Sequence, residues 1–131
     1  MHHTQAKTMN ILICEVEDIL MTAIRFRLQK NGFNMVAVKN GQEAINELEK
    51  SQTDIAIIGT QTTEVAAIEI IRYVRKVTKS DLPIIIVADL DEGDNVLELT
   101  NEGANDFTFR PFKPKGLMVR IKRLLTQVES S

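Results

Sequence analysis

Short runs of hydrophobic, largely β-branched residues alternate along this chain with longer segments in which hydrophobic residues recur every three or four positions. The short runs predict strands at 11–14, 35–38, 55–58, 84–88 and 107–109. All of these runs except 107–109 are hydrophobic throughout, which is typical of parallel strands that are covered on both faces.

The longer segments predict helices. The first pattern contains Leu20, Ile24 and Leu28, and it ends at Asn31-Gly32, a common C-terminal stop. The last pattern begins just after Pro114, which suits a first helical turn because its missing N–H needs no partner there. Strict alternation of five strands with five helices predicts an α/β fold, a doubly wound five-stranded parallel sheet with helices on both faces.

The length of 131 residues fits one domain. We expect a flexible N-terminal tail at 1–9, the domain at 10–128, and a C-terminal tail or the start of a linker at 129–131. The adjacent His2 and His3 are more typical of a tail than of a metal site. No hydrophobic stretch reaches the roughly 18 residues of a membrane span, and the N-terminus lacks the features of a secretory signal. We therefore expect a cytoplasmic protein that does not bind membranes.

The formal net charge of −2 does not indicate a nucleic-acid-binding protein, because binding to phosphates needs a concentrated basic surface. We therefore expect no direct binding to nucleic acid. The single cysteine, Cys14, excludes an intramolecular disulfide and lies in a hydrophobic run, where a small buried side chain is the expected role.

Candidate chemistry belongs at the carboxyl ends of the strands, in loops that begin near Glu15, Gly59, Ala88 and Arg110. The first loop contains acids where a dinucleotide site would contain glycines, so we expect no nucleotide cofactor. Glu17 and Asp18 have two interpretations, and both stay open: they belong to a functional site, or they only stabilise the positive end of the first helix. The sequence contains no nucleophile–base pair, metal-ligand cluster or cofactor loop, which predicts a protein that is not an enzyme and has no metal or cofactor.

Four motifs occur in the same order as in the receiver domain of two-component response regulators, which residues 10–127 resemble. They are Ile-Leu-Ile-Cys-Glu at 11–15, Asn-Gly-Gln-Glu-Ala at 40–44, Leu-Pro-Ile-Ile-Ile at 82–86, and Glu-Gly-Ala-Asn-Asp-Phe with Arg-Pro-Phe within 102–112. The resemblance implies a flavodoxin-like fold with strand order 2-1-3-4-5 and a role in phosphorelay signal transduction.

The resemblance also implies a phosphorylation pocket, but most of its residues differ here. The family uses two acids after the first strand, a phosphoacceptor aspartate after the third, a hydroxyl residue after the fourth and a lysine after the fifth. The matching positions in this chain are Glu15, Val16, Gly59, Ala88 and Arg110. Glycine offers no nucleophile, and one glutamate alone is a poor magnesium site. We therefore expect a degenerate receiver, or pseudo-receiver, that is not phosphorylated at the usual position.

A displaced phosphoacceptor is the minor alternative. Asp54 begins the third strand and should lie at the opposite edge of the sheet, whereas Glu64 and Asp89 flank the pocket loops. Thr60 would form a stable ester, which is not phosphorelay chemistry. Arg110 has two interpretations: a solvated charge at a strand end, or a guanidinium that fills the pocket and pairs with Glu15. The family resemblance also implies a cis Arg110–Pro111 bond.

Receiver domains usually contact partners through the fourth helix, fifth strand and fifth helix. Phe107 matches an aromatic whose rotation reports phosphorylation in the family. Asp106 and Arg120 match residues that bridge dimers in the subfamily with winged-helix DNA-binding domains, but Gly116 replaces a third, acidic position. The resemblance thus implies a weakened homodimer interface, and the alternative is that these two residues are ordinary surface charges.

These observations favour a phosphate-independent regulatory module that binds a sensor kinase or other signalling proteins. Two alternatives remain open. One is a small-molecule sensor that uses the altered pocket, and the other is the regulatory half of a DNA-binding response regulator whose effector domain is absent from this chain.

Overall fold

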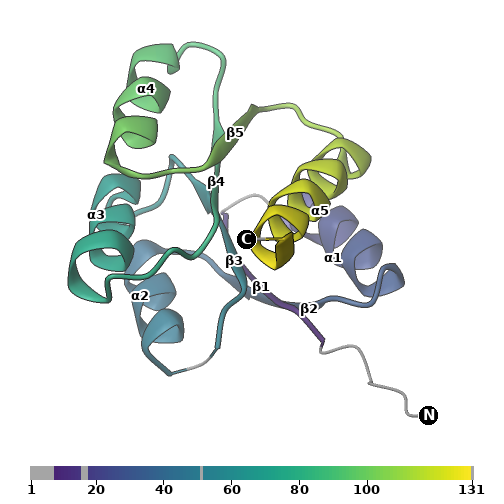
Figure 1. Cartoon of the computed structure of the whole chain (residues 1–131). Coiled ribbons are helices and arrows are strands. Elements are labelled where there is room, and N and C mark those ends of the chain that lie inside the picture. The colour runs from purple at the N-terminus through teal and green to yellow at the C-terminus, as the bar shows by residue number, and fades with distance from the viewer. Residues whose placement is uncertain (1–7, 16–17, 51, 131) are drawn as a thin grey trace.

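A computed structural model describes residues 8–15, 18–50 and 52–130, with side chains except at 18–19 and 127–130. Its centre is a five-stranded parallel sheet in the order β2-β1-β3-β4-β5 (Figure 1). The strands are β1 (Asn10–Cys14), β2 (Asn34–Val38), β3 (Ile55–Gly59), β4 (Ile84–Ala88) and β5 (Asp106–Phe109). The predicted doubly wound fold and its strand order are confirmed.

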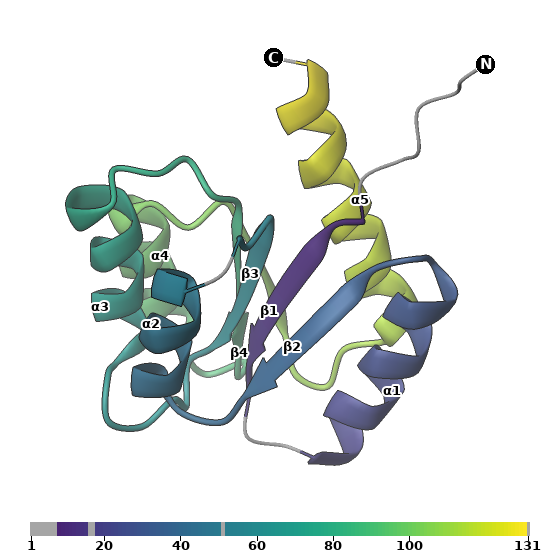
Figure 2. The same ribbon diagram turned by 90° about the horizontal axis from the view of Figure 1, so that it is seen from below.

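Helices cover both faces of the sheet, as Figure 2 shows. On one face lie α1 (Asp18–Lys30) and α5 (Pro114–Ser130), and on the other lie α2 (Gly41–Lys50), α3 (Ala67–Arg72) and α4 (Gly93–Glu102). The predicted third helix continues past Arg72 as the π-helical turn η1 (Tyr73–Val77). Among the described residues, no helix is long and hydrophobic enough to cross a membrane.

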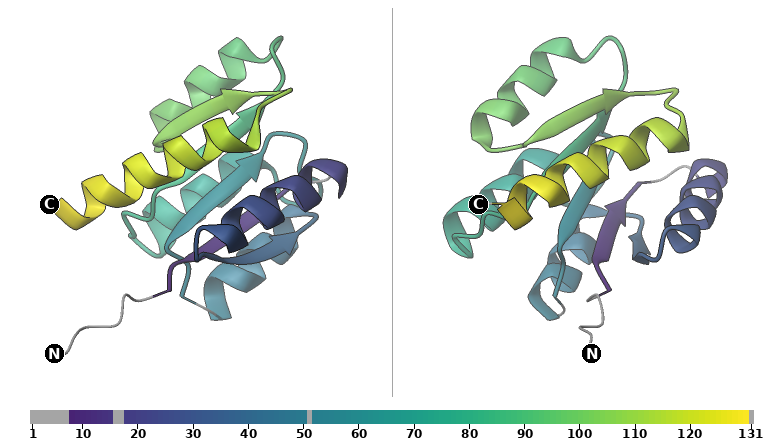
Figure 3. Two further views of the ribbon diagram at one scale, coloured as in Figure 1. Left: turned by 90° about the vertical axis from the view of Figure 1, so that its right-hand side faces the viewer. Right: turned by 45° about the vertical axis from the view of Figure 1, so that its right-hand side comes forward.

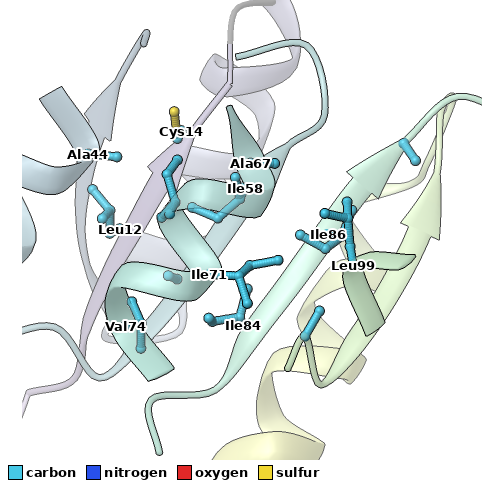
Figure 4. Packing of buried hydrophobic residues seen from close by; sticks show 14 of the residues in the cluster. Leu12, Cys14, Ala44, Ile58, Ala67, Ile71, Val74, Ile84, Ile86 and Leu99 are labelled. Atoms are coloured by element: carbon cyan, nitrogen blue, oxygen red, sulfur yellow. The ribbon is translucent and has the colours of Figure 1, made fainter. Parts of the chain in front are cut away.

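The sheet separates two hydrophobic cores because successive side chains of a strand point to opposite faces. In β1, Leu12 and Cys14 face the core under α2, α3 and α4, whereas Ile11 and Ile13 face the core under α1 and α5. Figure 4 shows the first core, where Ile71 of α3 packs over the sheet. Burial on both faces explains why the central strands are hydrophobic throughout.

Hydrogen bonds explain Asn40 and close packing explains Gly41 in the motif at the start of α2. The Asn40 side chain accepts a 2.8 Å hydrogen bond from the Glu43 N–H, and the Glu43 carboxylate accepts one from the Lys39 N–H at 3.0 Å. These bonds satisfy donors at the helix start. A Cβ atom at Gly41 would overlap the Val65 backbone carbonyl, so only glycine fits here.

The described structure extends slightly past residues 10 and 128, the predicted limits of the domain. Residues 1–7 of the predicted N-terminal tail lie outside the described residues. Met9, also assigned to that tail, packs against the core, and its carbonyl accepts a hydrogen bond from the Asn34 N–H. At the other end, α5 continues to Ser130, two residues beyond the predicted end of the domain at residue 128.

We predict that Ile71→Ala lowers the free energy of unfolding by about 2–5 kcal/mol, because it leaves a cavity in the first core. Chemical denaturation followed by circular dichroism measures the loss. The control is Val77→Ala, whose side chain is 69% exposed and whose removal should change stability by less than about 0.5 kcal/mol. Equal effects of the two substitutions would contradict this description of the core.

Candidate functional site

Four of the predicted pocket residues lie together at the carboxyl edge of the sheet. Glu15 follows β1 and is 3% exposed, Gly59 ends β3, and Ala88 ends β4. Arg110 follows β5, and its backbone N–H donates a 2.8 Å hydrogen bond to the Ala88 carbonyl. Parallel strands bring these positions to one edge, although they are far apart in the sequence. Val16, the fifth predicted pocket residue, lies outside the described residues.

A bidentate ion pair joins Arg110 to Glu15. The Arg110 Nη2 atom lies 2.7 Å from Glu15 Oε1 and 2.8 Å from Oε2, and Nε lies 3.0 Å from Oε2. The Arg110 side chain is only 12% exposed, so the interpretation of it as a solvated charge is wrong and the predicted pair is confirmed. Two parallel N–H···O bonds fix both position and orientation. The Arg110–Pro111 bond is cis, as the family resemblance implies.

Gly59 lies directly against this ion pair. A Cβ atom at Gly59 would come within 2.7 Å of Glu15 Oε1 and 2.9 Å of Arg110 Nη2. Both distances are shorter than normal van der Waals contact. The ion pair therefore occupies the space that a side chain at position 59 would need.

Asp89 extends the ion pair into the loop after β4. Arg110 Nη1 lies 3.3 Å from Asp89 Oδ1, and the Gln61 side-chain amide donates a 2.6 Å bond to Asp89 Oδ2. This links the loops that follow β1, β3, β4 and β5 in one network. The position of Asp89 near the pocket was predicted from the sequence, whereas the part played by Gln61 was not.

Glu92 forms a second centre beside this network. Its carboxylate accepts hydrogen bonds from the Thr60 hydroxyl at 2.6 Å, the Asp89 N–H at 2.8 Å and the Asn95 amide at 3.3 Å. Thr60 therefore connects the end of β3 to the start of α4. Neither Glu92 nor Asn95 was predicted from the sequence. The spacing of Asp89 and Glu92 ahead of a helix, similar to a capping pattern, is the signal that could have found Glu92.

The surroundings of these groups favour their charged forms. Burial by itself lowers the pKa of Arg110, but hydrogen bonding and the negative charges of Glu15 and Asp89 outweigh it and raise the pKa. Burial likewise raises the pKa of Glu92, but the hydrogen bonds from Asp89, Thr60 and Asn95 outweigh it and lower the pKa. The guanidinium is thus a permanent positive charge at this edge.

The other acids considered as displaced phosphoacceptors or helix caps lie in different places. Asp54 lies at the opposite edge of the sheet, as predicted, where its carboxylate accepts a 2.7 Å bond from the Asn10 N–H. Glu64 is exposed in the loop after β3. The described residues contain no group of three or more His, Cys, Asp or Glu side chains placed to hold a metal ion. Glu17 lies outside the described residues, and the side chain of Asp18 is not described.

The predicted interaction face lies beside this site. Arg120 Nη1 is 2.8 Å from Asp106 Oδ1, so these two residues pair within one chain. Phe107 is 39% exposed and stacks edge-to-face on Phe109, with ring centroids 5.5 Å apart. Leu97 of α4 and Val119 of α5 are exposed hydrophobic residues on the elements of this face.

Sequence comparison identifies the family. Residues 11–122 match the model of the response regulator receiver domain, so the chain belongs to this family of two-component signalling domains.

Similar proteins include the alkaline phosphatase synthesis transcriptional regulatory protein PhoP of Bacillus subtilis, 28% identical over 91% of this chain and 49% of that protein. The sensory transduction protein RegX3 of Mycolicibacterium smegmatis is 31% identical over 88% of this chain and 50% of that protein. The chain thus spans about half the length of these curated relatives.

Solved structures share the fold. A CheY-like receiver domain protein from Methanospirillum hungatei superposes with a TM-score of 0.87 at 18% identity, covering 95% of this chain and 98% of that one. The receiver domain of a histidine kinase from Syntrophus aciditrophicus superposes with a TM-score of 0.83 at 25% identity, covering 95% of each chain.

We predict that Arg110→Met destabilises the protein by about 3–5 kcal/mol, because it removes the guanidinium that pairs with the buried Glu15 carboxylate. The double variant Glu15→Leu/Arg110→Met removes both charges and should recover most of the loss. Denaturant unfolding of the wild type, both single variants and the double variant measures the coupling. Additive effects of the single substitutions would contradict a direct interaction.

Cys14 should resist thiol reagents in the folded protein. Its side chain is fully buried, and burial together with the nearby carboxylates of Glu15 and Glu43 raises its pKa to about 12. We expect labelling by a disulfide reagent at neutral pH to be at least ~10³-fold slower in native buffer than in denaturant. Rapid labelling of the native protein would contradict this burial.

Proposed function

We propose that this receiver domain is a non-enzymatic pseudo-receiver that regulates protein partners without being phosphorylated at the usual position. The observation that carries this proposal is the position of the Arg110–Glu15 ion pair against Gly59. A phosphoacceptor aspartate would need the space and the open edge that this pair now fills.

The remaining pocket residues are consistent with this proposal. Ala88 offers no hydroxyl to a phosphoryl oxygen, and Gly59 offers no nucleophile. Magnesium binding needs carboxylate oxygens that are free to coordinate, and Arg110 engages both oxygens of Glu15. A guanidinium in this place supplies permanently the positive charge that a receiver otherwise directs at a phosphoryl group.

We further propose that partners bind the surface of α4, β5 and α5 that presents Leu97, Asp106, Phe107 and Arg120. A sensor kinase or another signalling protein is the expected partner. A homodimer through this surface is weakened, because Asp106 and Arg120 pair with each other within one chain instead of across the dimer. Gly116 also supplies no acidic side chain.

Two further roles have specific support. The chain matches about half the length of each curated relative. This favours a role as the regulatory half of a response regulator, in which a separate domain binds DNA. A hollow of about 400 Å³ lined by Leu20, Asp89, Arg110, Pro111 and Phe112 favours binding of a small molecule beside the pocket. A thermal-shift screen in which no metabolite raises the melting temperature would count against the second role.

Intact-mass spectrometry after incubation with acetyl phosphate and Mg²⁺ tests the proposal. We expect the natural chain to gain no phosphoryl group, because position 59 offers no carboxylate. A variant with Val16→Asp, Gly59→Asp, Ala88→Thr and Arg110→Lys restores the residue types of the family pocket. It should gain one phosphoryl group that hydroxylamine removes, as expected of an aspartyl phosphate, which shows that the conditions are adequate.

A labile phosphoryl group on the natural chain would contradict the proposal. Peptide mapping would then locate the acid that carries it, and Asp89 is the first residue to examine because it contacts Arg110 at the pocket edge.

A further inference from the structure

Basic residues gather on one layer of this molecule, although the net charge of the chain is −2. Along 20–30 of α1 and 114–126 of α5, where side chains are described, every charged residue is basic. These residues are Arg25, Arg27, Lys30, Lys115, Arg120, Lys122 and Arg123. In contrast, residues 89–102, in and before α4, include only acids among their charged residues. The net charge therefore averages over two faces of opposite sign.

The two basic helices lie next to each other. They pack against each other on the same face of the sheet, and Figure 3 shows them side by side. The Lys122 Nζ atom donates a 3.0 Å hydrogen bond to the Asn31 side chain at the end of α1, which joins the two helices at that end. Arg25, Lys30, Lys115 and Arg123 are exposed.

Six of these seven positive charges are not neutralised within the described part of the chain. Arg120 of α5 lies within ion-pair distance of a carboxylate, as do Lys50 and Arg72 on the other side of the sheet. Among the described residues, none of the six others on α1 and α5 forms such a pair: Arg25, Arg27, Lys30, Lys115, Lys122 and Arg123. Uncompensated cations on one face attract a polyanion and also orient it, because the acidic α4 side repels it.

An exposed aromatic residue lies among these cations. Phe26 is 67% exposed and is flanked in sequence by Arg25 and Arg27, with Lys30 one helical turn further along. An aromatic ring in a basic surface offers a platform on which an unpaired base can stack, while the cations bind the phosphates. Duplex nucleic acid presents no unpaired base, so the ring gives a reason to favour single strands.

We propose that the α1–α5 surface, defined by Phe26 and the unpaired basic residues Arg27, Lys30, Lys115, Lys122 and Arg123, binds single-stranded nucleic acid through its phosphates. This inference is independent of the proposed pseudo-receiver function, because it uses none of the pocket residues. It assigns the domain a second surface on the side of the sheet away from α4.

Fluorescence anisotropy with a labelled oligothymidine of about 16 nucleotides tests the proposal. We expect binding at low salt, with the logarithm of the association constant falling with the logarithm of salt concentration at a slope of about −3 if four phosphates are contacted. Lys30→Glu/Lys122→Glu should weaken binding at least about tenfold. The control Lys50→Glu/Lys76→Glu makes the same change in net charge on the other side of the sheet and should weaken it far less.

Phe26→Ala distinguishes single strands from other polyanions. We expect it to weaken oligothymidine binding roughly tenfold and to leave binding to duplex DNA unchanged. Circular dichroism confirms that each variant is folded. Absence of oligothymidine binding at low salt would overturn the proposal, as would equal weakening by both charge variants. Tighter binding to anionic lipid vesicles or to polyglutamate than to oligothymidine would also overturn it, by assigning the surface to another anion.

Discussion

The arrangement of the carboxyl edge depends on one buried ion pair. Glu15 is enclosed after β1, and a carboxylate in that position is stable only with a partner that satisfies it. Arg110 reaches it from the end of β5, past the ends of β4 and β3, and so joins an edge strand of the sheet to β1. This path requires that residue 59 have no side chain, and it places the third guanidinium nitrogen near Asp89.

In our account, this constraint lets a complete receiver scaffold work without phosphorylation at the usual position. In a receiver that responds to phosphorylation, the charge at the carboxyl edge of the sheet changes when the phosphoryl group is attached. Here the positive charge of Arg110 is already matched by two acids, and the Thr60–Glu92 hydrogen bond separately fixes the end of β3 against the start of α4. In our account, the edge therefore has a fixed charge arrangement, and regulation comes from what binds the surfaces around it.

Much of this could be predicted from the sequence. The hydrophobic runs predicted all five strands, of which β1, β3 and β4 are buried on both faces and β2 and β5 are partly exposed. The positions of Glu15 and Arg110 after two strands gave their pairing as one of two interpretations of Arg110. The π-helical turn after Arg72 was not predictable, since the hydrophobic spacing continues through it. Gln61 and Glu92 were missed because their roles depend on how loops fold. The charged surface of α1 and α5 was missed because net charge carries no information about which face a residue occupies.

The central claim is that the Arg110–Glu15 pair fills the pocket in place of phosphate chemistry. The most direct test is a titration of the ¹⁵N-labelled protein with Mg²⁺ and beryllofluoride, which mimics a phosphoryl group on a carboxylate, followed by amide correlation spectra. Our account predicts no saturable shifts at Gly59, Ala88 or Arg110. Saturable shifts centred on these three amides would show that the pocket still accepts a phosphoryl-like ligand and would contradict the account.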